Sequence, residues 1–389
     1  MRNFSYYNPT CVHFGLGEFE KLGEYTAQFG KKALLVKTTG SLERLGIYAA
    51  AKKMLEAEGV AVCEISGVAA NPKLSKIEEA IKICKAEGVD VVVPIGGGSC
   101  IDAAKAIAYG ALDDGDIWDF FALKREAAAS LPIVAVSTLA ATGSEMNSNC
   151  VVTNDRDPDP KNWLKWATHF DHSFPKVAII DPALQKTLPK YITACGMVDI
   201  ISHIVEPYFD GEPNTPVQDA LGEGVVKTVI ASEKILEDIE NLTLRANLSW
   251  CATVAINGWA SSGHIPKSWD AHTIEHDVGA YTDCAHGAGL AVIQPAWLYY
   301  LNKQNPEKFV QFAKNVFGIE QDGLSDYEVG VKGIDMLKEK FRSWGMPMTL
   351  RELHVEEEML PVLASKVVQS PEGQNLNYEE VLAVLETCF

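Results

Sequence analysis

The sequence predicts two domains: an α/β domain built on a doubly wound parallel sheet, followed by an all-helical domain. Strand and helix patterns alternate in the first half of the chain, whereas helical runs dominate from Leu188 onward. The chain has 389 residues, a length that favours about two domains. We expect the first domain to span residues 1–185 and the second to span residues 186–389.

The α/β prediction rests on short apolar runs separated by amphipathic stretches. The run at 89–96 is apolar almost throughout, as expected where helices cover both faces of a parallel sheet. After Val151, a segment broken by Pro and Asp predicts a hairpin that returns Lys165 toward the sheet. The expected strands are 33–37, 60–66, 89–96, 131–138 and 176–181, and the expected helices are 42–59, 74–88 and one from about Ser99.

Composition and charge exclude several classes of partner. The formal net charge of −18 argues against nucleic acid and against anionic membranes. No stretch approaches the roughly 20 apolar residues of a membrane span, and the N-terminal residues contain no apolar signal region. The nine cysteines show no C-x-x-C spacing, which is typical of reduced thiols. We therefore expect a cytoplasmic protein, whereas the charge says little about the substrate.

A glycine-rich turn follows the predicted strand at 89–96. Gly96–Ser99 would let backbone N–H groups approach a diphosphate, beside the positive end of the next helix dipole. The spacing is not G-x-G-x-x-G, and Ser99 with Asp102 could instead form an ordinary capping box. The hydroxyl-rich loop 137–145 would form the opposite wall of a cofactor crevice, the alternative being a plain polar turn.

The end of the first predicted strand bears on the choice between NAD and NADP. An NAD site usually has an acidic residue there, which binds the ribose and repels a 2′-phosphate. Residues Lys37–Ser41 contain no acid and several hydrogen-bond donors. The sequence therefore favours NADP, although a neutral site can also hold NAD.

Two patches rich in His and Asp predict one divalent metal centre. Asp199 and His203 are four residues apart in an apolar run, so a helix would place both on one face. His272, His276 and His286 form the second patch, and the first two are one helical turn apart, so both could reach an ion. A carboxylate with imidazoles suits a divalent transition metal. The alternative is a buried Asp–His hydrogen bond without a metal.

Four motifs resemble those of the iron-containing (group III) alcohol dehydrogenases, in particular the butanol dehydrogenase and aldehyde reductase branch that favours NADP. They read GGGSCIDAAK, ATGSEMN, MVDIISHIVEPYF and AHTIEHDVGAYTDCAHGAGLA, and the resemblance covers nearly the whole chain. It implies an α/β nucleotide-binding domain and an all-helical metal-binding domain, with the active site in the cleft between them. It also implies NADP or NAD as cofactor, Fe²⁺ or alternatively Zn²⁺ as the metal, and a homodimer.

The resemblance also assigns individual residues. The implied metal ligands are Asp199, His203, His272 and His286, whereas His276 lines the cleft without binding the metal. Residues 38–41 read TTGS, which matches neither the acid of NAD-dependent members nor the GGGS of the aldehyde reductases. From the resemblance and the patterns above together, the expected cofactor contacts are Thr38, Thr39, Gly40, Ser41, Asn71, Gly96, Gly97, Gly98, Ser99, Asp102, Thr138, Thr142 and Lys165.

The implied reaction is reversible hydride transfer between nicotinamide and a primary alcohol or its aldehyde. The metal would act as a Lewis acid at the substrate oxygen, in a site that one carboxylate and three neutral imidazoles leave net positive. His276 would relay a proton. The rival interpretations are a dehydroquinate-synthase-like lyase, a glycerol dehydrogenase, a phosphohydrolase with His276 and Asp277 as its His-Asp dyad, and a binding protein that has lost activity.

Overall fold

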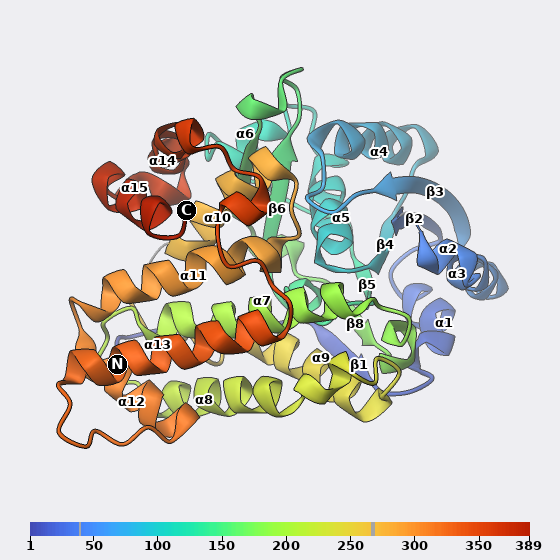
Figure 1. Ribbon diagram of the computed structural model, residues 1–389. Coiled ribbons are helices and arrows are strands. Elements are labelled where there is room, and N and C mark those ends of the chain that lie inside the picture. Colours follow the sequence, from blue (N-terminus) through green and yellow to red (C-terminus); the bar gives the residue numbers. More distant parts are fainter. Residues whose placement is uncertain (39, 266–268) are drawn as a thin grey trace. The chain divides into compact units, whose positions relative to one another are not determined.

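The computed structural model describes residues 1–38, 40–265 and 269–389 and divides into two compact units. The sheet unit comprises Tyr7–Leu188 and Glu240–Ser249, and the helical unit comprises Met1–Tyr6, Pro189–Ile239 and Trp250–Phe389. Two short segments lie across the boundary predicted at 185: Met1–Tyr6 belongs to the helical unit, and Glu240–Ser249 belongs to the sheet unit. The predicted combination of an α/β part and a mainly helical part is confirmed (Figure 1).

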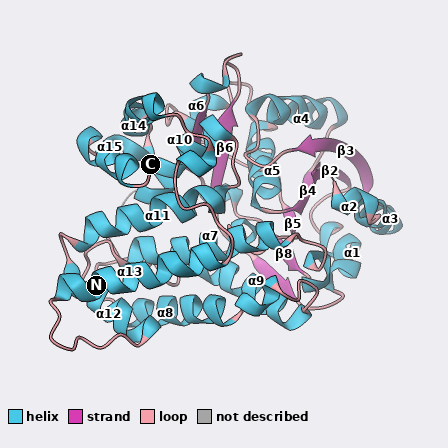
Figure 2. Ribbon diagram, in the orientation of Figure 1, coloured by secondary structure: helices cyan, strands magenta, loops and turns pink. Residues whose placement is uncertain are grey.

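The sheet unit is built on a six-stranded sheet in the order β1-β8-β5-β4-β2-β3, shown in magenta in Figure 2. Every neighbouring pair in this sheet is parallel, as the alternation of strands and helices predicts. The strands are β1 (Cys11–Phe14), β2 (Lys32–Thr38), β3 (Ala61–Val68), β4 (Val91–Gly96), β5 (Val134–Ser137) and β8 (Val177–Ile180).

Helices cover both faces of this sheet, because alternate residues of each strand point to opposite sides. Leu34 and Val36 of β2 belong to a core cluster with apolar residues of α4 (Leu74–Glu87) and α5 (Gly98–Gly110). Ala33 and Leu35 belong to a second cluster, with residues of α1 (Leu22–Thr26) and α3 (Ile47–Ala57). Burial on both faces explains why β4 is apolar along its whole length.

Two predicted elements differ from the structure. The helix expected at 42–59 is two helices, α2 (Ser41–Arg44) and α3, because Gly46 has a φ of 72° and ends the first one. The strand expected at 131–138 shortens to β5, and Ile133 contributes only an isolated bridge to Val92.

The predicted hairpin is confirmed. Strands β6 (Asn149–Asn154) and β7 (Leu164–His169) form a separate two-stranded antiparallel sheet in which Thr153 is opposite Lys165. Thr153 also bridges to Lys73, in the loop after β3. Strand β6 of the hairpin therefore lies next to that loop, and Lys165 lies on the strand beyond it. The short helix α6 (Trp118–Phe121) packs against β7.

The helical unit is formed around α7 (Lys190–Tyr208), which is buried from Thr193 to Val205. A helix that is apolar on all sides must lie inside a protein or a membrane, and none of the helices in the described part of the chain is long and apolar enough to span a bilayer. Helix α11 (His286–Asn302) packs against both α7 and α10 (Asp270–Thr282). Helix α9 (Leu242–Ile256) begins in the sheet unit and ends in the helical unit. The others are α8 (Pro216–Ala231), α12 (Pro306–Phe317), α13 (Asp326–Ser343), α14 (Leu360–Gln369) and α15 (Tyr378–Thr387).

Candidate metal and cofactor sites

The four predicted metal ligands come from three helices of the helical unit. Asp199 and His203 lie one turn apart on α7, His272 lies in the first turn of α10, and His286 is the first residue of α11. Packing of α11 against α7 and α10 brings these positions together, although they are distant in the sequence. Asp199, His203 and His272 are buried, and the His286 side chain is 23% exposed.

The ligand atoms of Asp199, His272 and His286 form a group that could hold a divalent cation, and His203 lies beside Asp199 outside that group. Oδ1 of Asp199 lies 3.6 Å from Nε2 of His203, 3.6 Å from Nε2 of His272 and 3.6 Å from Nε2 of His286. Ligand atoms about 2.1 Å from one tetrahedral ion would be about 3.4 Å apart. Within the described part of the chain, Asp199 Oδ1 and His272 Nε2 are buried without a hydrogen-bond partner. Such buried polar atoms are costly unless a ligand satisfies them.

The electrostatics of this cluster follow from its burial and its mixed charges. Burial alone would raise the pKa of the Asp199 carboxyl, but the imidazoles of His203, His272 and His286 outweigh it and lower that pKa. Burial lowers the pKa of His203 to about 3. For His272, burial acts in the same direction, but the Glu206 and Asp199 carboxylates outweigh it and raise the pKa to about 10.

His276 occupies a different position from the four predicted ligands. Its ring centroid lies 5.7 Å from that of His286. Its ligand atom groups with those of Glu275 and His286, and a second group contains Asp199, His272 and His286. The implied place of His276 beside the metal and its part in proton transfer both stay predictions.

Two residues of this cluster were missed by the sequence analysis. Glu206 contacts His272, and Glu275 contacts His286, each through Nδ1 of the imidazole. Both glutamates follow a predicted ligand by three residues, His203 and His272 respectively, so helical spacing could have indicated them.

Several of the predicted cofactor residues lie at the carboxyl end of the sheet. Strand β4 lies between β2 and β5, with Lys37 paired to Ile95 and Gly96 paired to Ser137. Strand β3 lies on the other side of β2, so the strand order reverses between β2 and β4. Ligands of open α/β sheets bind at such a switch point, where Thr38, Gly97 and Thr138 lie in this chain.

The glycine turn packs tightly against the hydroxyl-rich loop. A Cβ atom on Gly98 would lie 2.2 Å from Oγ1 of Thr142, so glycine is required by this contact. The capping box considered for Ser99 is not formed, because Gly97 is the N-cap of α5. The Asp102 carboxylate instead accepts hydrogen bonds from Oγ of Ser144 and from the backbone N–H of Val151.

The structure describes the predicted ribose site only in part. Thr39 lies outside the described residues, as does the side chain of Ser41, and Gly40 is exposed. The backbone N–H of Thr38 donates to the Tyr48 hydroxyl, and its own hydroxyl contacts the same group at 2.9 Å.

The charged group next to this site is Lys37. Its ammonium lies 2.8 Å from a carboxylate oxygen of Glu64 and 3.4 Å from one of Glu43. Two carboxylates that the sequence analysis did not consider therefore lie close to the end of β2.

Asn71 and Lys165 lie on the loop after β3 and on the hairpin. Both are buried, and Asn71 has a positive φ of 52°. Because Thr153 faces Lys165 in the hairpin and bridges to Lys73, the two segments lie side by side.

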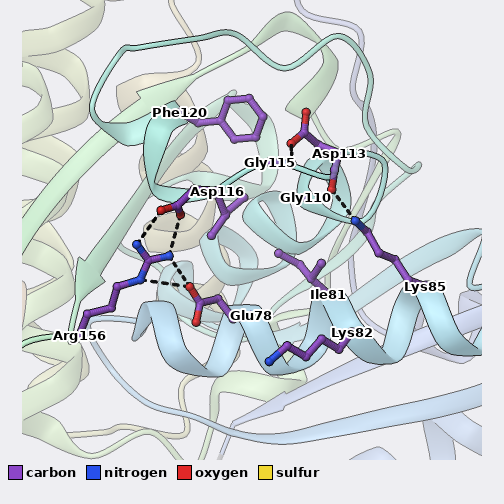
Figure 3. Close-up of a pocket in the computed structure, with 11 residues that line it drawn as sticks. Glu78, Ile81, Lys82, Lys85, Gly110, Asp113, Gly115, Asp116, Phe120 and Arg156 are labelled. Atoms are coloured by element: carbon purple, nitrogen blue, oxygen red, sulfur yellow. Dashed lines mark hydrogen bonds and ion pairs between the residues drawn. The ribbon is translucent and has the colours of Figure 1, made fainter.

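A separate surface cavity of about 310 Å³ lies between α4 and the loop at 113–117 (Figure 3). Arg156, just beyond β6, reaches into it and bonds to Glu78 and Asp116. None of the predicted site residues is among those that line this cavity, so we read Arg156 as an anchor of the hairpin on α4. The lining residues are Glu78, Ile81, Lys82, Lys85, Gly110, Asp113, Gly115, Asp116, Ile117, Phe120 and Arg156.

Two models of one protein family match this chain, one over the part that contains the switch point of the sheet and one over the part that contains the Asp/His cluster. The family model described as "Iron-containing alcohol dehydrogenase" matches residues 9–182, and the model for the C-terminal region of the Fe-containing alcohol dehydrogenase family matches residues 193–389. The chain belongs to the iron-containing alcohol dehydrogenase family, which confirms the predicted resemblance.

Individual relatives carry more specific names. The chain is 40% identical over 390 residues to the probable NADH-dependent butanol dehydrogenase 1 of Bacillus subtilis, covering 99% of both sequences. It is 31% identical over 372 residues to the NADPH-dependent aldehyde reductase YqhD of Escherichia coli, covering 94% of this chain and 93% of the relative. The crystal structure of NADH-dependent butanol dehydrogenase A from Thermotoga maritima superimposes with a TM-score of 0.94 at 39% identity, covering 100% of this chain and 99% of the other.

Proposed function

We propose that this protein is a metal-dependent alcohol dehydrogenase and aldehyde reductase that transfers hydride between a nicotinamide cofactor and a primary alcohol or its aldehyde. The observation that carries the proposal is the convergence of three imidazoles on one buried oxygen of Asp199. The names of the relatives support a substrate similar to butanol or butanal. The family favours this function over a phosphohydrolase that would use His276 and Asp277.

Asp199 and the three histidines around its Oδ1 would hold the ion. The family description favours Fe²⁺, and Zn²⁺ is the alternative that the same ligand types accept. When bound, the ion supplies Lewis acidity at the substrate oxygen, and the nicotinamide supplies or accepts the hydride. We assign His276 the proton transfer to or from that oxygen, because it lies beside His286 and imidazole titrates near neutral pH.

The residues at the carboxyl end of the sheet would bind and orient the cofactor. The backbone of Gly96–Ser99 at the start of α5 would receive the diphosphate. Thr138 and Thr142 would form one wall, and Asn71 with Lys165 another. This assignment is supported by the switch point between β2 and β4.

For the choice of cofactor we propose NADH, in place of the NADP that residues 38–41 favoured. The ammonium of Lys37 already forms ion pairs with Glu64 and Glu43, so its charge is largely compensated before a 2′-phosphate could bind. The relatives that are 37–40% identical are named NADH-dependent, whereas the NADPH-dependent reductase is 31% identical.

We further propose a homodimer that forms through the outer edge of β1, the end strand of the sheet. An exposed edge strand offers unpaired backbone groups to a second chain. Phe14 at its end and Leu16 just after it are 39% and 63% exposed, which supports an apolar contact there. A cytoplasmic location also stays a proposal, in keeping with nine cysteines that are all thiols.

The metal assignment is tested with Asp199→Ala. We expect the variant to lose most bound metal and to lower kcat/KM for butanal by at least ~1,000-fold, because Lewis acidity contributes several kcal/mol to the transition state. Metal content is measured by mass spectrometry, and folding by circular dichroism. Asp114→Ala, at a fully exposed carboxylate, is the control. Full activity and metal content in Asp199→Ala would refute the proposal.

A further inference from the structure

Glu206 connects two of the helices that carry the candidate metal ligands. It lies on α7, three residues after His203, and its side chain is 6% exposed. One carboxylate oxygen accepts from the backbone N–H of Ala271 at 3.0 Å, and the other accepts from the backbone N–H of His272 at 3.2 Å. The second oxygen also contacts Nδ1 of the His272 imidazole. Glu206 therefore holds both the start of α10 and the ring of its ligand.

Glu275 repeats this arrangement one helix further along the chain. It lies on α10, three residues after His272, and its side chain is fully buried. Its carboxylate contacts Nδ1 of His286, whose Nε2 faces Asp199. Gly289 makes room for it, because a Cβ atom there would lie 2.6 Å from Cγ of Glu275.

The third imidazole has no such support. In the described part of the structure, Nδ1 of His203 is buried without a hydrogen-bond partner. His203 is positioned by ring contacts instead, with its centroid 4.8 Å from that of His272 and 5.8 Å from that of Trp269.

We propose that Glu206 and Glu275 are positioning residues that fix the orientation and tautomer of His272 and His286 and thereby set the affinity for the metal. An acceptor at Nδ1 places the ring proton there, which leaves Nε2 as the ligand atom and makes it more basic. The inference rests on the metal site of the proposed function. It also replaces the expectation of a net positive site, since the carboxylates of Asp199, Glu206 and Glu275 would surround a cation of charge +2.

Each of the two helices thus presents a carboxylate to the imidazole of the next ligand helix: α7 to α10, and α10 to α11. This arrangement ties the packing of the helices to the geometry of the ligands. Removing the charge of either glutamate should therefore weaken metal binding more than it weakens the fold.

The experiment measures the metal affinity of Glu206→Gln and Glu275→Gln. Metal-free protein is titrated with Zn²⁺ in competition with a chromophoric chelator, and the visible spectrum is recorded after loading with Co²⁺. We expect the Kd for Zn²⁺ to rise by about 10- to 100-fold, as is usual for outer partners of metal-bound histidine. A shifted Co²⁺ spectrum would report an altered ligand geometry, which a purely structural role would leave unchanged.

The matched control is Glu223→Gln. Glu223 is a buried glutamate of α8 that accepts a hydrogen bond from the Tyr208 hydroxyl at 2.7 Å and does not contact a candidate ligand. Its substitution should leave the Kd for Zn²⁺ within about twofold of wild type. Thermal melts of all metal-free variants test folding, and Glu275→Asp replaces Glu275→Gln if the latter does not fold.

The outcomes separate this inference from the proposed function. If wild type binds one Zn²⁺ that Asp199→Ala does not bind, but both glutamine variants bind Zn²⁺ as wild type does, the inference is wrong and the metal site stands. If wild type binds no ion at this site, the proposed function itself fails.

Discussion

The buried cation Lys105 provides a quantitative test of how the hydroxyl-rich loop is held. Lys105 lies on α5 and has no exposed surface. Its ammonium donates to Oγ of Ser144 at 2.7 Å, to Oδ1 of Asn147 at 3.0 Å and to the carbonyl of Asn149 at 2.7 Å. It also lies 3.9 Å from the carboxylate of Asp102, and burial lowers its pKa. We predict that Lys105→Met destabilises the protein strongly.

The expected loss follows from these contacts. The methionine fills similar space but leaves the Asp102 carboxylate without its neighbouring cation and the Asn149 carbonyl without this donor. Breaking a buried pair by removing one partner costs about 3–5 kcal/mol. Each hydrogen bond to a charged group contributes about 1.5–3 kcal/mol. The methionine variant avoids the desolvation cost of burying the Lys105 ammonium, but the loss of its hydrogen bonds is larger. We therefore expect a fall of about 3–5 kcal/mol in the free energy of unfolding.

Urea unfolding followed by tryptophan fluorescence measures this change. Lys82→Met, at an exposed lysine of α4, is the matched control and should change the free energy of unfolding by less than about 0.5 kcal/mol. Adding Asp102→Asn to Lys105→Met should recover part of the loss, because the uncompensated charge is then absent. A loss below about 1 kcal/mol in Lys105→Met would show that the loop does not depend on this cation.

Three further predictions concern the cofactor, its selectivity and the oligomer. Gly98→Ala should destabilise the protein by about 1–3 kcal/mol and raise the KM for cofactor, because its Cβ would lie 2.2 Å from Thr142 Oγ1. The double variant with Thr142→Gly should recover stability, and a Gly98→Ala variant as stable as wild type would contradict the packing argument. With butanal, kcat/KM should be higher for NADH than for NADPH, and the reverse ratio would restore the preference read from residues 38–41. Light scattering should give twice the 42.4 kDa chain mass, and a monomeric wild type would overturn the dimer. Leu16→Glu should yield monomer, whereas the control Leu112→Glu, at a residue that is 54% exposed, should not.

The fold was predictable where local patterns decide it. The apolar run that becomes β4 and the amphipathic run that becomes α4 were both placed within two residues. The order of the strands was not predictable, because it depends on pairings between residues far apart, such as those of β1 with β8. The break between α2 and α3 was visible as Gly46, but the apolar periodicity on both sides of it concealed the end of the first helix.

The candidate metal cluster was predictable in part for a similar reason. Asp and His in an apolar run are unusual enough to attract notice, and their helical spacing indicates a shared face. Glu206 and Glu275 have the same spacing, but glutamate on a helix usually faces solvent. Only the packing of α7, α10 and α11 shows that these two carboxylates are buried against imidazoles. Counting them as part of the site, as we propose, changes the net charge expected for it.

The two candidate sites should respond differently to substitution, because they are built by different means. At the carboxyl end of the sheet, the strand order and close packing fix the site, and several predicted contacts act through backbone or small side chains. Volume is therefore the sensitive variable there, as at Gly98. In the helical unit, the side chains themselves supply the ligand atoms and their supports. Isosteric changes such as Glu275→Gln barely alter volume, so they should leave the fold intact and weaken metal binding.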